Sequence, residues 1–254
     1  MAETTQTRVA LITGGSRGIG AATTLALAEH GYDVVLTYRN KAARADDVVS
    51  QATQRGVRAL AVGCDITLPG DRERLFHTLH GWSAHLDLLV LNASGGMERE
   101  ALANDPDYPM HINRDAQIAL LDHALPLLPR GGVVVFVTSH WAHLYGQVAQ
   151  IPAYAPVAES KHAGELALRA RQQELTALGI RLIIVTGDLV AGTITPKLLE
   201  RAAPGLAGQR HTSSGTLPST TDMGEAIVHA ATNVALPSGH VVVVGGSLAS
   251  LLHS

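Results

Sequence analysis

Short apolar runs alternate with longer Ala- and Leu-rich stretches along almost the whole chain, and this alternation limits the possible folds more than any other feature. The short runs, rich in Val, Leu and Ile, span residues 9–13, 34–38, 59–63, 86–91, 133–137, 182–185 and 241–244. Most are apolar at every position, as is typical of strands buried on both faces of a parallel sheet. Helices are predicted between them, over residues 21–30, 42–55, 70–79, 112–125, 157–178 and 222–232. The pattern predicts one doubly wound α/β domain over residues 1–254, with about seven parallel strands and helices on both faces.

The composition of the chain argues against several kinds of partner and site. The chain has 254 residues, 46% of them apolar, which is enough to bury a large core. Its net charge of −3 provides no broad basic surface, so neither nucleic acid nor a membrane is expected as a partner. The single cysteine, Cys64, excludes an internal disulfide and a multi-cysteine zinc site. Because the N-terminus has no apolar signal core and no run is long enough to span a membrane, a cytoplasmic protein is expected.

The first strand runs directly into a glycine-rich turn, Thr13-Gly-Gly-Ser-Arg-Gly-Ile-Gly20, which a helix follows. Glycines let the backbone turn tightly and approach a pyrophosphate, whose charge is favoured at a helix N-terminus. Such a turn after the first strand of a βαβ unit is typical of a Rossmann dinucleotide site. The residues expected to contact the dinucleotide here are Thr13, Gly14, Ser16, Arg17, Gly18, Ile19 and Gly20.

The end of the second strand indicates which dinucleotide is bound. An acidic residue there would hydrogen-bond the adenosine ribose and repel a 2′-phosphate. This chain has Arg39 and Asn40 instead, and Arg17 lies in the glycine turn. Because two guanidinium groups suit a dianionic phosphate, NADP(H) is the expected cofactor. The alternative is that Arg39 is a solvated charge at the start of a helix and that both cofactors are accepted.

The spacing Gly14-x3-Gly18-x-Gly20 resembles the T-G-x3-G-x-G signature of the short-chain dehydrogenase/reductase family. Three later segments extend the resemblance over nearly the whole chain: Cys64-Asp-Ile66, Leu91-Asn-Ala-Ser-Gly95 and Gly239-His-Val-Val-Val-Val-Gly-Gly246. The resemblance implies that the Asp65 carboxylate accepts from the adenine amino group. The other cofactor contacts that it implies are Ile66, Asn92, Ala93, Ser94, Lys161, Val190 and Thr193.

The same resemblance implies a catalytic set for carbonyl reduction. In the family, a Ser polarises the carbonyl oxygen and a Tyr donates the proton. A Lys lowers the Tyr pKa and holds the nicotinamide ribose, and an Asn supports a water relay. Ser139, Lys161 and Asn113 match three of these positions. The structural alternatives are a simple end-of-strand Ser139 and a capping or buried amide at Asn113.

The proton donor departs from the family pattern. The family spaces Tyr and Lys four residues apart, and Val157 stands where that spacing places the Tyr. Tyr154 instead precedes the lysine by seven residues. Because Pro156 favours the first turn of a helix, we expect Tyr154 to lie in a looped-out segment before the helix, turned toward Ser139. Tyr145 is the second candidate for the donor.

Two further features lie near this site. His140 and His143 follow the catalytic serine position, but the local sequence supplies too few ligands for a metal, so no metal site is expected. Residues 189–218, rich in Gly, Thr, Ser and Pro, follow the sixth strand at the end where such folds bind ligands. We expect this segment to cover the substrate, with an ordinary surface excursion as the alternative.

Together these features predict an NADPH-dependent ketoreductase acting on a small-molecule ketone. Residues 154–161 and 187–195 also resemble an actinobacterial subgroup, some of whose members reduce ketones on angucycline-type aromatic polyketides in antibiotic biosynthesis. Two alternatives stay open: an NADP(H)-binding sensor without turnover, which Val157 favours, and an alcohol dehydrogenase working in the oxidative direction. The family resemblance implies a homotetramer or a homodimer.

Overall fold

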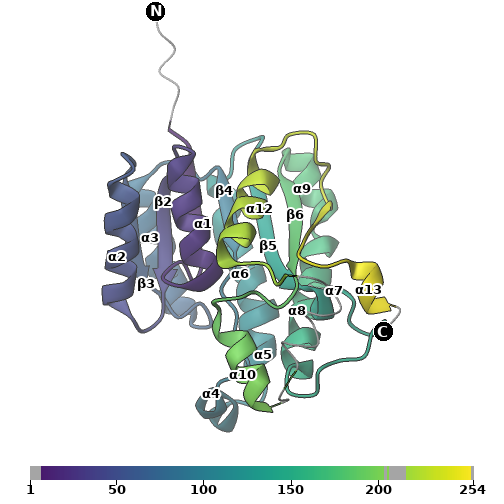
Figure 1. Ribbon diagram of the computed structural model, residues 1–254. Helices are drawn as coiled ribbons and strands as arrows, with labels where there is room; N and C mark the ends of the chain where they lie inside the picture. Colours follow the sequence, from purple (N-terminus) through teal and green to yellow (C-terminus); the bar gives the residue numbers. More distant parts are fainter. Residues whose placement is uncertain (1–6, 203–204, 206–215, 253–254) are drawn as a thin grey trace, which may run out of the picture.

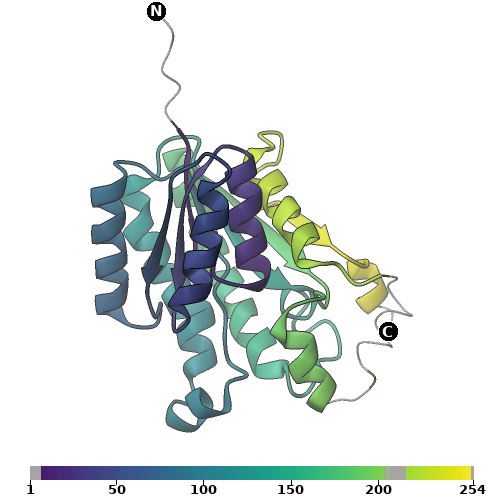
Figure 2. The same ribbon diagram turned by 60° about the vertical axis from the view of Figure 1, so that its left-hand side comes forward.

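A parallel sheet of seven strands in the order β3-β2-β1-β4-β5-β6-β7 forms the centre of the protein, with helices on both faces (Figures 1 and 2). The computed structural model describes residues 7–202, 205 and 216–252. The strands are β1 (Val9–Ile12), β2 (Asp33–Tyr38), β3 (Ala59–Gly63), β4 (Leu88–Leu91), β5 (Val133–Ser139), β6 (Arg181–Gly187) and β7 (Val241–Val244). The predicted doubly wound Rossmann fold is confirmed.

The helices connect successive strands, apart from the last one, which follows β7. The longer ones are α1 (Gly18–Glu29), α2 (Ala42–Thr53), α3 (Pro69–Trp82), α6 (Ala116–Ala124), α8 (Ala155–Ala170), α9 (Gln172–Leu178), α10 (Ile194–Ala202) and α12 (Thr220–Thr232). The short ones are α4 (Arg99–Asn104), α5 (Tyr108–Met110), η1 (His111–Asp115), η2 (Leu125–Leu127), α7 (His140–His143) and α13 (Leu248–Leu252). In Figure 1, α1, α2 and α12 lie in front of the sheet, and α3, α6, α8 and α9 lie behind it.

The sheet separates two apolar cores. On one face, Leu27 of α1 and Ile227 of α12 cover the strands, and on the other face Leu75 of α3, Leu120 of α6 and Leu168 of α8 do so. All five side chains are fully buried, and each contributes about 1.5–3 kcal/mol relative to an exposed position. Because both faces of the sheet are covered in this way, the central strands are apolar at consecutive positions.

Several predicted boundaries are corrected. The helix expected over 112–125 begins as the π-helical turn η1 and continues as α6. The helix expected over 157–178 begins at Ala155 and is interrupted at Arg171, whose N–H bonds the Leu168 oxygen three residues back. The irregular segment expected over 189–218 contains the helix α10, while residues 203–204 and 206–215 of that segment lie outside the described residues.

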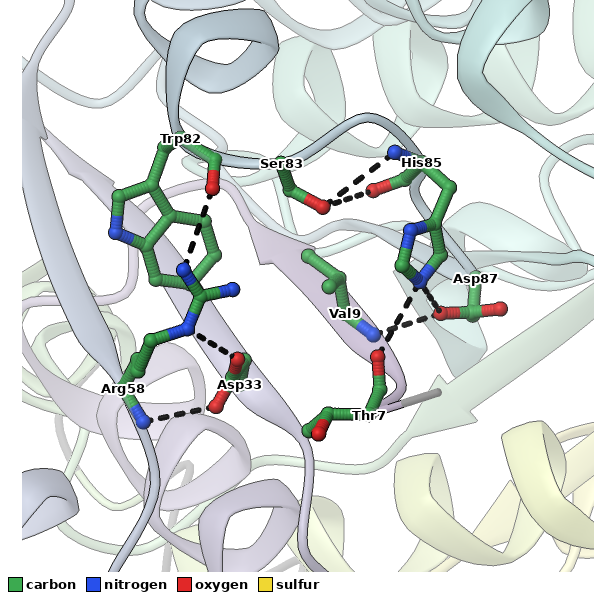
Figure 3. A network of polar contacts seen from close by, with 8 residues as sticks. All are labelled: Thr7, Val9, Asp33, Arg58, Trp82, Ser83, His85 and Asp87. Atoms are coloured by element: carbon green, nitrogen blue, oxygen red, sulfur yellow. Dashed lines mark hydrogen bonds and ion pairs between the residues drawn. The ribbon is translucent and has the colours of Figure 1, made fainter. Parts of the chain in front are cut away.

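Polar contacts join the amino-terminal ends of neighbouring strands to one another (Figure 3). Asp33, at the start of β2, accepts from the backbone N–H of Arg58 at 2.8 Å and from its guanidinium at 2.6 Å. The same guanidinium lies 4.3 Å from the centroid of the Trp82 ring. Asp87 accepts from the Val9 N–H at 2.7 Å and so joins β4 to β1. These contacts lie at one end of the sheet and leave the carboxyl ends of the strands open.

Gly164 marks the closest approach of α8 to η1. A Cβ atom at this position would lie 2.1 Å from the backbone oxygen of Asn113. Because that obstacle is backbone, we expect Gly164→Ala to lower the free energy of unfolding by about 1–3 kcal/mol, measured by urea and thermal unfolding. Gly81 in α3 is the matched control, since a Cβ there would meet nothing within 4 Å. Gly81→Ala should be neutral or stabilising, and equal destabilisation of both variants would contradict the account.

Candidate active site

A cleft opens at the carboxyl ends of the strands, where the strand order reverses between β1 and β4. Doubly wound sheets bind their ligands at this point. One part of the cleft, about 530 Å³, lies over the glycine turn and the ends of β2 and β3. The other part, about 320 Å³, lies over the ends of β5 and β6. Arg17, Asn92 and Ser94 line both parts, so the two form one continuous cleft.

The glycine turn has the shape that a phosphate cradle requires. Gly14 has a φ of +68°, a conformation that side chains disfavour. A Cβ at Gly20 would lie 2.3 Å from the Gly14 oxygen, so only glycine fits where the turn meets α1. The predicted residues Gly14, Ser16, Arg17, Gly18, Ile19 and Gly20 all line the cleft. The amino end of α1 therefore borders a space that favours an anion.

Thr13 lies behind this turn and not in the cleft. Its hydroxyl accepts from the N–H groups of Asn92 and Ala93, both at 3.0 Å, and its backbone oxygen accepts from Asn92 Nδ2 at 2.9 Å. Thr13 is fully buried, whereas Asn92 and Ala93 line the cleft. The threonine thus joins β1 to the loop after β4 and positions the residues that face a ligand.

Positive side chains gather in the larger part of the cleft: Arg17, Arg39, Arg44 and Lys197. Asn40, predicted beside Arg39, does not line the cleft. Arg44 was not predicted, although it lies in the first turn of a predicted helix close to Arg39. Lys197 comes from α10, which the sequence pattern did not indicate. Arginines and a lysine at one end of a cleft suit a phosphate group.

Asp65 and Ile66 line the same part of the cleft, after β3. One carboxylate oxygen of Asp65 accepts from the N–H of Thr67 at 3.0 Å and from its hydroxyl at 2.7 Å. The other oxygen makes no side-chain hydrogen bond with a described residue. Asp65 therefore has a fixed orientation and one oxygen left to accept from a ligand.

Tyr154 and Ser139 meet in the smaller part of the cleft. The Tyr154 phenol donates to Ser139 Oγ at 3.1 Å. Tyr154 is the N-cap residue of α8, and Pro156 lies in the first turn of that helix. Ser139 ends β5, and its hydroxyl also accepts from the Ala142 N–H at 3.2 Å. The phenol therefore reaches the serine from the residue immediately before the helix, which begins at Ala155.

The two other residues considered for the Tyr position lie elsewhere. Val157 lines the cleft as an apolar wall. Tyr145 does not line the cleft: its ring lies near that of His162, with 5.8 Å between ring centroids. Tyr154 is therefore the phenol beside Ser139.

Lys161 faces the same part of the cleft from α8. It is 8% exposed, and its ammonium makes no hydrogen bond or ion pair with a described residue. Burial lowers the pKa of Lys161 from 10.5 to about 8. Burial also raises the pKa of Tyr154, and the hydrogen bond to Ser139 opposes that change. The ammonium is thus available to hydroxyl groups of a ligand.

Asn113 lies behind the cleft, in the π-helical turn η1. Its Nδ2 donates to the Gly95 oxygen and to Ser160 Oγ, both at 2.9 Å. Its Oδ1 accepts from Ser94 Oγ at 2.8 Å. Because Ser94 lines the cleft and Ser160 precedes Lys161, this one amide fixes the loop after β4 against the helix that carries the lysine.

Val190 and Thr193 line the cleft after β6, and the Thr193 hydroxyl donates to the Val190 oxygen at 2.9 Å. The remaining wall is largely apolar and was mostly missed by sequence reasoning, because its residues come from separate elements: Met97, Trp141, Leu189, Leu198 and Met223. A pair of hydroxyls, one buried and one half-buried, in a mostly apolar space that a lysine also lines is suited to proton transfer to a carbonyl oxygen.

His140 and His143 do not line the cleft. His140 Nε2 lies 2.7 Å from the Gly245 oxygen, and His143 Nδ1 lies 3.0 Å from the Glu165 carboxylate. Among the residues that the structure describes, no group of three or more His, Cys, Asp and Glu side chains could hold a metal ion. In the same part of the chain, no helix is both long and apolar enough to cross a membrane.

Comparison with known proteins identifies the family. Residues 8–202 match the family described as short chain dehydrogenase. The chain belongs to this family. Among curated relatives, it is 36% identical over 161 residues to the hydroxynaphthalene reductase-like protein Arp2 of Metarhizium robertsii. That match covers 62% of this chain and spans 59% of the length of Arp2.

Two solved structures of this family are similar over nearly the whole chain. The reductase LugOII, described as catalysing keto-reduction at C1 during lugdunomycin biosynthesis, is 26% identical with a TM-score of 0.79. That match covers 95% of this chain and 98% of LugOII. The landomycin C-6 ketoreductase LanV, solved with bound NADP and rabelomycin, is 25% identical with a TM-score of 0.76, covering 95% of this chain and 96% of LanV. The predicted short-chain dehydrogenase/reductase membership is thus confirmed.

Proposed function

We propose that this short-chain dehydrogenase/reductase is an NADPH-dependent ketoreductase. The observation that carries the proposal is the hydrogen bond between Tyr154 and Ser139 in a cleft that also holds the unpaired ammonium of Lys161. Support for the cofactor comes from the glycine cradle and from the arginines at the far end of the same cleft. Reductases of this family with bound NADP, such as LanV, have the same fold.

The cleft residues divide into groups that fit the parts of the cofactor. The glycine turn would hold the pyrophosphate, and Arg39, together with Arg17, the 2′-phosphate. Asp65 would accept from the adenine amino group, with Ile66 against its ring. Lys161 would bind the hydroxyls of the nicotinamide ribose. Val190 and Thr193 would hold the carboxamide. When bound, NADPH supplies the hydride that reduces the carbonyl carbon.

The protein's own part in the chemistry is to hold and protonate the carbonyl oxygen. Two hydroxyls 3.1 Å apart can both reach one oxygen atom, so Ser139 donates a hydrogen bond while Tyr154 transfers its proton as alkoxide charge develops. Lys161, through its positive charge, stabilises the tyrosinate that remains. Asn113 positions the helix that carries Lys161 through its bond to Ser160.

The mostly apolar wall of the smaller part of the cleft suits a ketone on a large apolar framework. We extend the proposal to polycyclic aromatic polyketides and antibiotic biosynthesis, on the basis of the similarity to LugOII and LanV. Residues 189–218 would cover this substrate, since Leu189, Val190, Thr193 and Leu198 of that segment already line the cleft. A cytoplasmic location and a homodimer or homotetramer complete the proposal.

Oxidation of NADPH, followed at 340 nm with a panel of ketones that includes polycyclic quinones, tests this function. We expect turnover with NADPH and much slower turnover with NADH. Oxidation of the matching alcohols with NADP⁺ reports the preferred direction. Tight NADPH binding without turnover on any ketone or alcohol would favour a sensor and contradict the proposal.

A further inference from the structure

One hydrogen bond in the larger part of the cleft joins Arg39 to a residue that lies 69 positions later in the sequence. The Arg39 guanidinium donates from Nη1 to the Tyr108 phenol oxygen at 2.6 Å. Both residues line the cleft. We propose that Tyr108 is a positioning residue that orients Arg39 for the cofactor 2′-phosphate and so sets the preference for NADPH over NADH. This inference rests on the cofactor assignment of the proposed function.

The Tyr108 side chain is held in one position by the residues around it. It belongs to α5 and is only 7% exposed. Its ring packs in the core with Ile112, and a Cβ at Gly95 would lie 3.1 Å from both the phenol oxygen and the ring. The surrounding residues therefore fix the position of the phenol oxygen, whereas an exposed tyrosine could move.

Arg39, in contrast, is exposed and would otherwise be free to move. The bond to Tyr108 uses one end of the guanidinium. The Nε and Nη2 groups make no hydrogen bond with a described residue, and Arg39 forms no ion pair with a described carboxylate. That remaining edge of the guanidinium has the geometry that binds two oxygens of one phosphate. Because Tyr108 holds the guanidinium in place before the ligand binds, less conformational entropy of Arg39 is lost on binding.

Binding of two cofactor fragments, measured by calorimetry without any turnover, tests the inference. 2′,5′-ADP carries the 2′-phosphate and 5′-ADP lacks it. We expect the unsubstituted protein to bind 2′,5′-ADP more tightly than 5′-ADP. Tyr108→Phe should weaken 2′,5′-ADP binding by about three- to tenfold, the range expected for one hydrogen bond, and leave 5′-ADP binding unchanged.

Two further variants make the test specific. Tyr32 is the matched control, because it is also buried and accepts from an arginine, Arg8, at 3.1 Å, but at the opposite end of the sheet. Tyr32→Phe should change the affinity for neither fragment. Arg39→Ala should reduce the preference for 2′,5′-ADP more than Tyr108→Phe does, and adding Tyr108→Phe to it should cause no further loss. Thermal unfolding confirms that each variant is folded.

The outcomes separate this inference from the cofactor assignment. Equal binding of the two fragments by the unsubstituted protein would overturn the NADPH preference itself. If the unsubstituted protein prefers 2′,5′-ADP and Tyr108→Phe keeps or strengthens that preference, only the proposed role of Tyr108 is overturned. Equal weakening of both fragments in Tyr108→Phe would show a general structural effect and would also overturn it.

Discussion

Replacing Tyr154 with Phe should lower kcat for ketone reduction by about a thousandfold, because a positioned general acid contributes 10²–10⁴-fold and no second phenol lies beside Ser139 among the described residues. The substitution keeps the ring and removes only the oxygen that donates to Ser139. NADPH binding should therefore stay unchanged. Steady-state kinetics for kcat and fluorescence titration for NADPH affinity measure the two quantities separately.

Tyr145→Phe is the matched control for this prediction. Tyr145 lies nine residues earlier, on His162 and outside the cleft, so its loss should leave kcat close to that of the unsubstituted protein. Full activity in Tyr154→Phe would remove Tyr154 from the mechanism. An equal loss in both variants would indicate a general structural effect instead of proton donation.

Replacing Lys161 with Met should make the unliganded protein more stable and nearly inactive. Burial holds the pKa of Lys161 at about 8 against 10.5 in the unfolded chain. Since a pKa unit corresponds to about 1.4 kcal/mol, carrying the charge at neutral pH costs the folded state up to about 3 kcal/mol. Methionine fills similar space without that charge. Urea unfolding at pH 7 should show a higher free energy of unfolding in Lys161→Met.

The lowered pKa of Lys161 also predicts how the free energy of unfolding changes with pH. The folded protein loses the Lys161 proton near pH 8 and the unfolded chain near pH 10.5, so the contribution of this group to stability rises between these values and is constant below them. In Lys161→Met, the free energy of unfolding should lack the increase that this group contributes between about pH 8 and pH 10.5. Lys197→Met, at an exposed lysine, is the control and should leave stability unchanged at pH 7. A Lys161→Met variant that is less stable than the unsubstituted protein at pH 7 would contradict the account.

Much of the fold could be predicted from the sequence, because burial on both faces of the sheet requires consecutive apolar residues in the strands. The glycine turn was also predictable, since the close approach at Gly20 excludes any side chain. Pro156 indicated that Tyr154 lies before its helix, and Tyr154 is the N-cap residue of α8. The helix itself begins at Ala155, two residues earlier than expected.

Other parts of the site depend on tertiary structure. A motif predicts that Thr13 and Asn113 are present near the cofactor, but not that their side chains point into the scaffold behind the cleft. The bond between Arg39 and Tyr108 joins residues 69 positions apart, with no local pattern to indicate it. Lys197 was missed because the Gly- and Thr-rich composition around α10 suggested an irregular segment.

A crystal structure with NADP⁺ and an unreactive ketone would show whether Tyr154 and Ser139 together form the proton-donating site. We expect the ketone oxygen within about 3 Å of both Tyr154 Oη and Ser139 Oγ, and the Lys161 ammonium within hydrogen-bonding distance of the ribose hydroxyls. A ketone oxygen held by another donor, with the Tyr154 phenol out of reach, would contradict it.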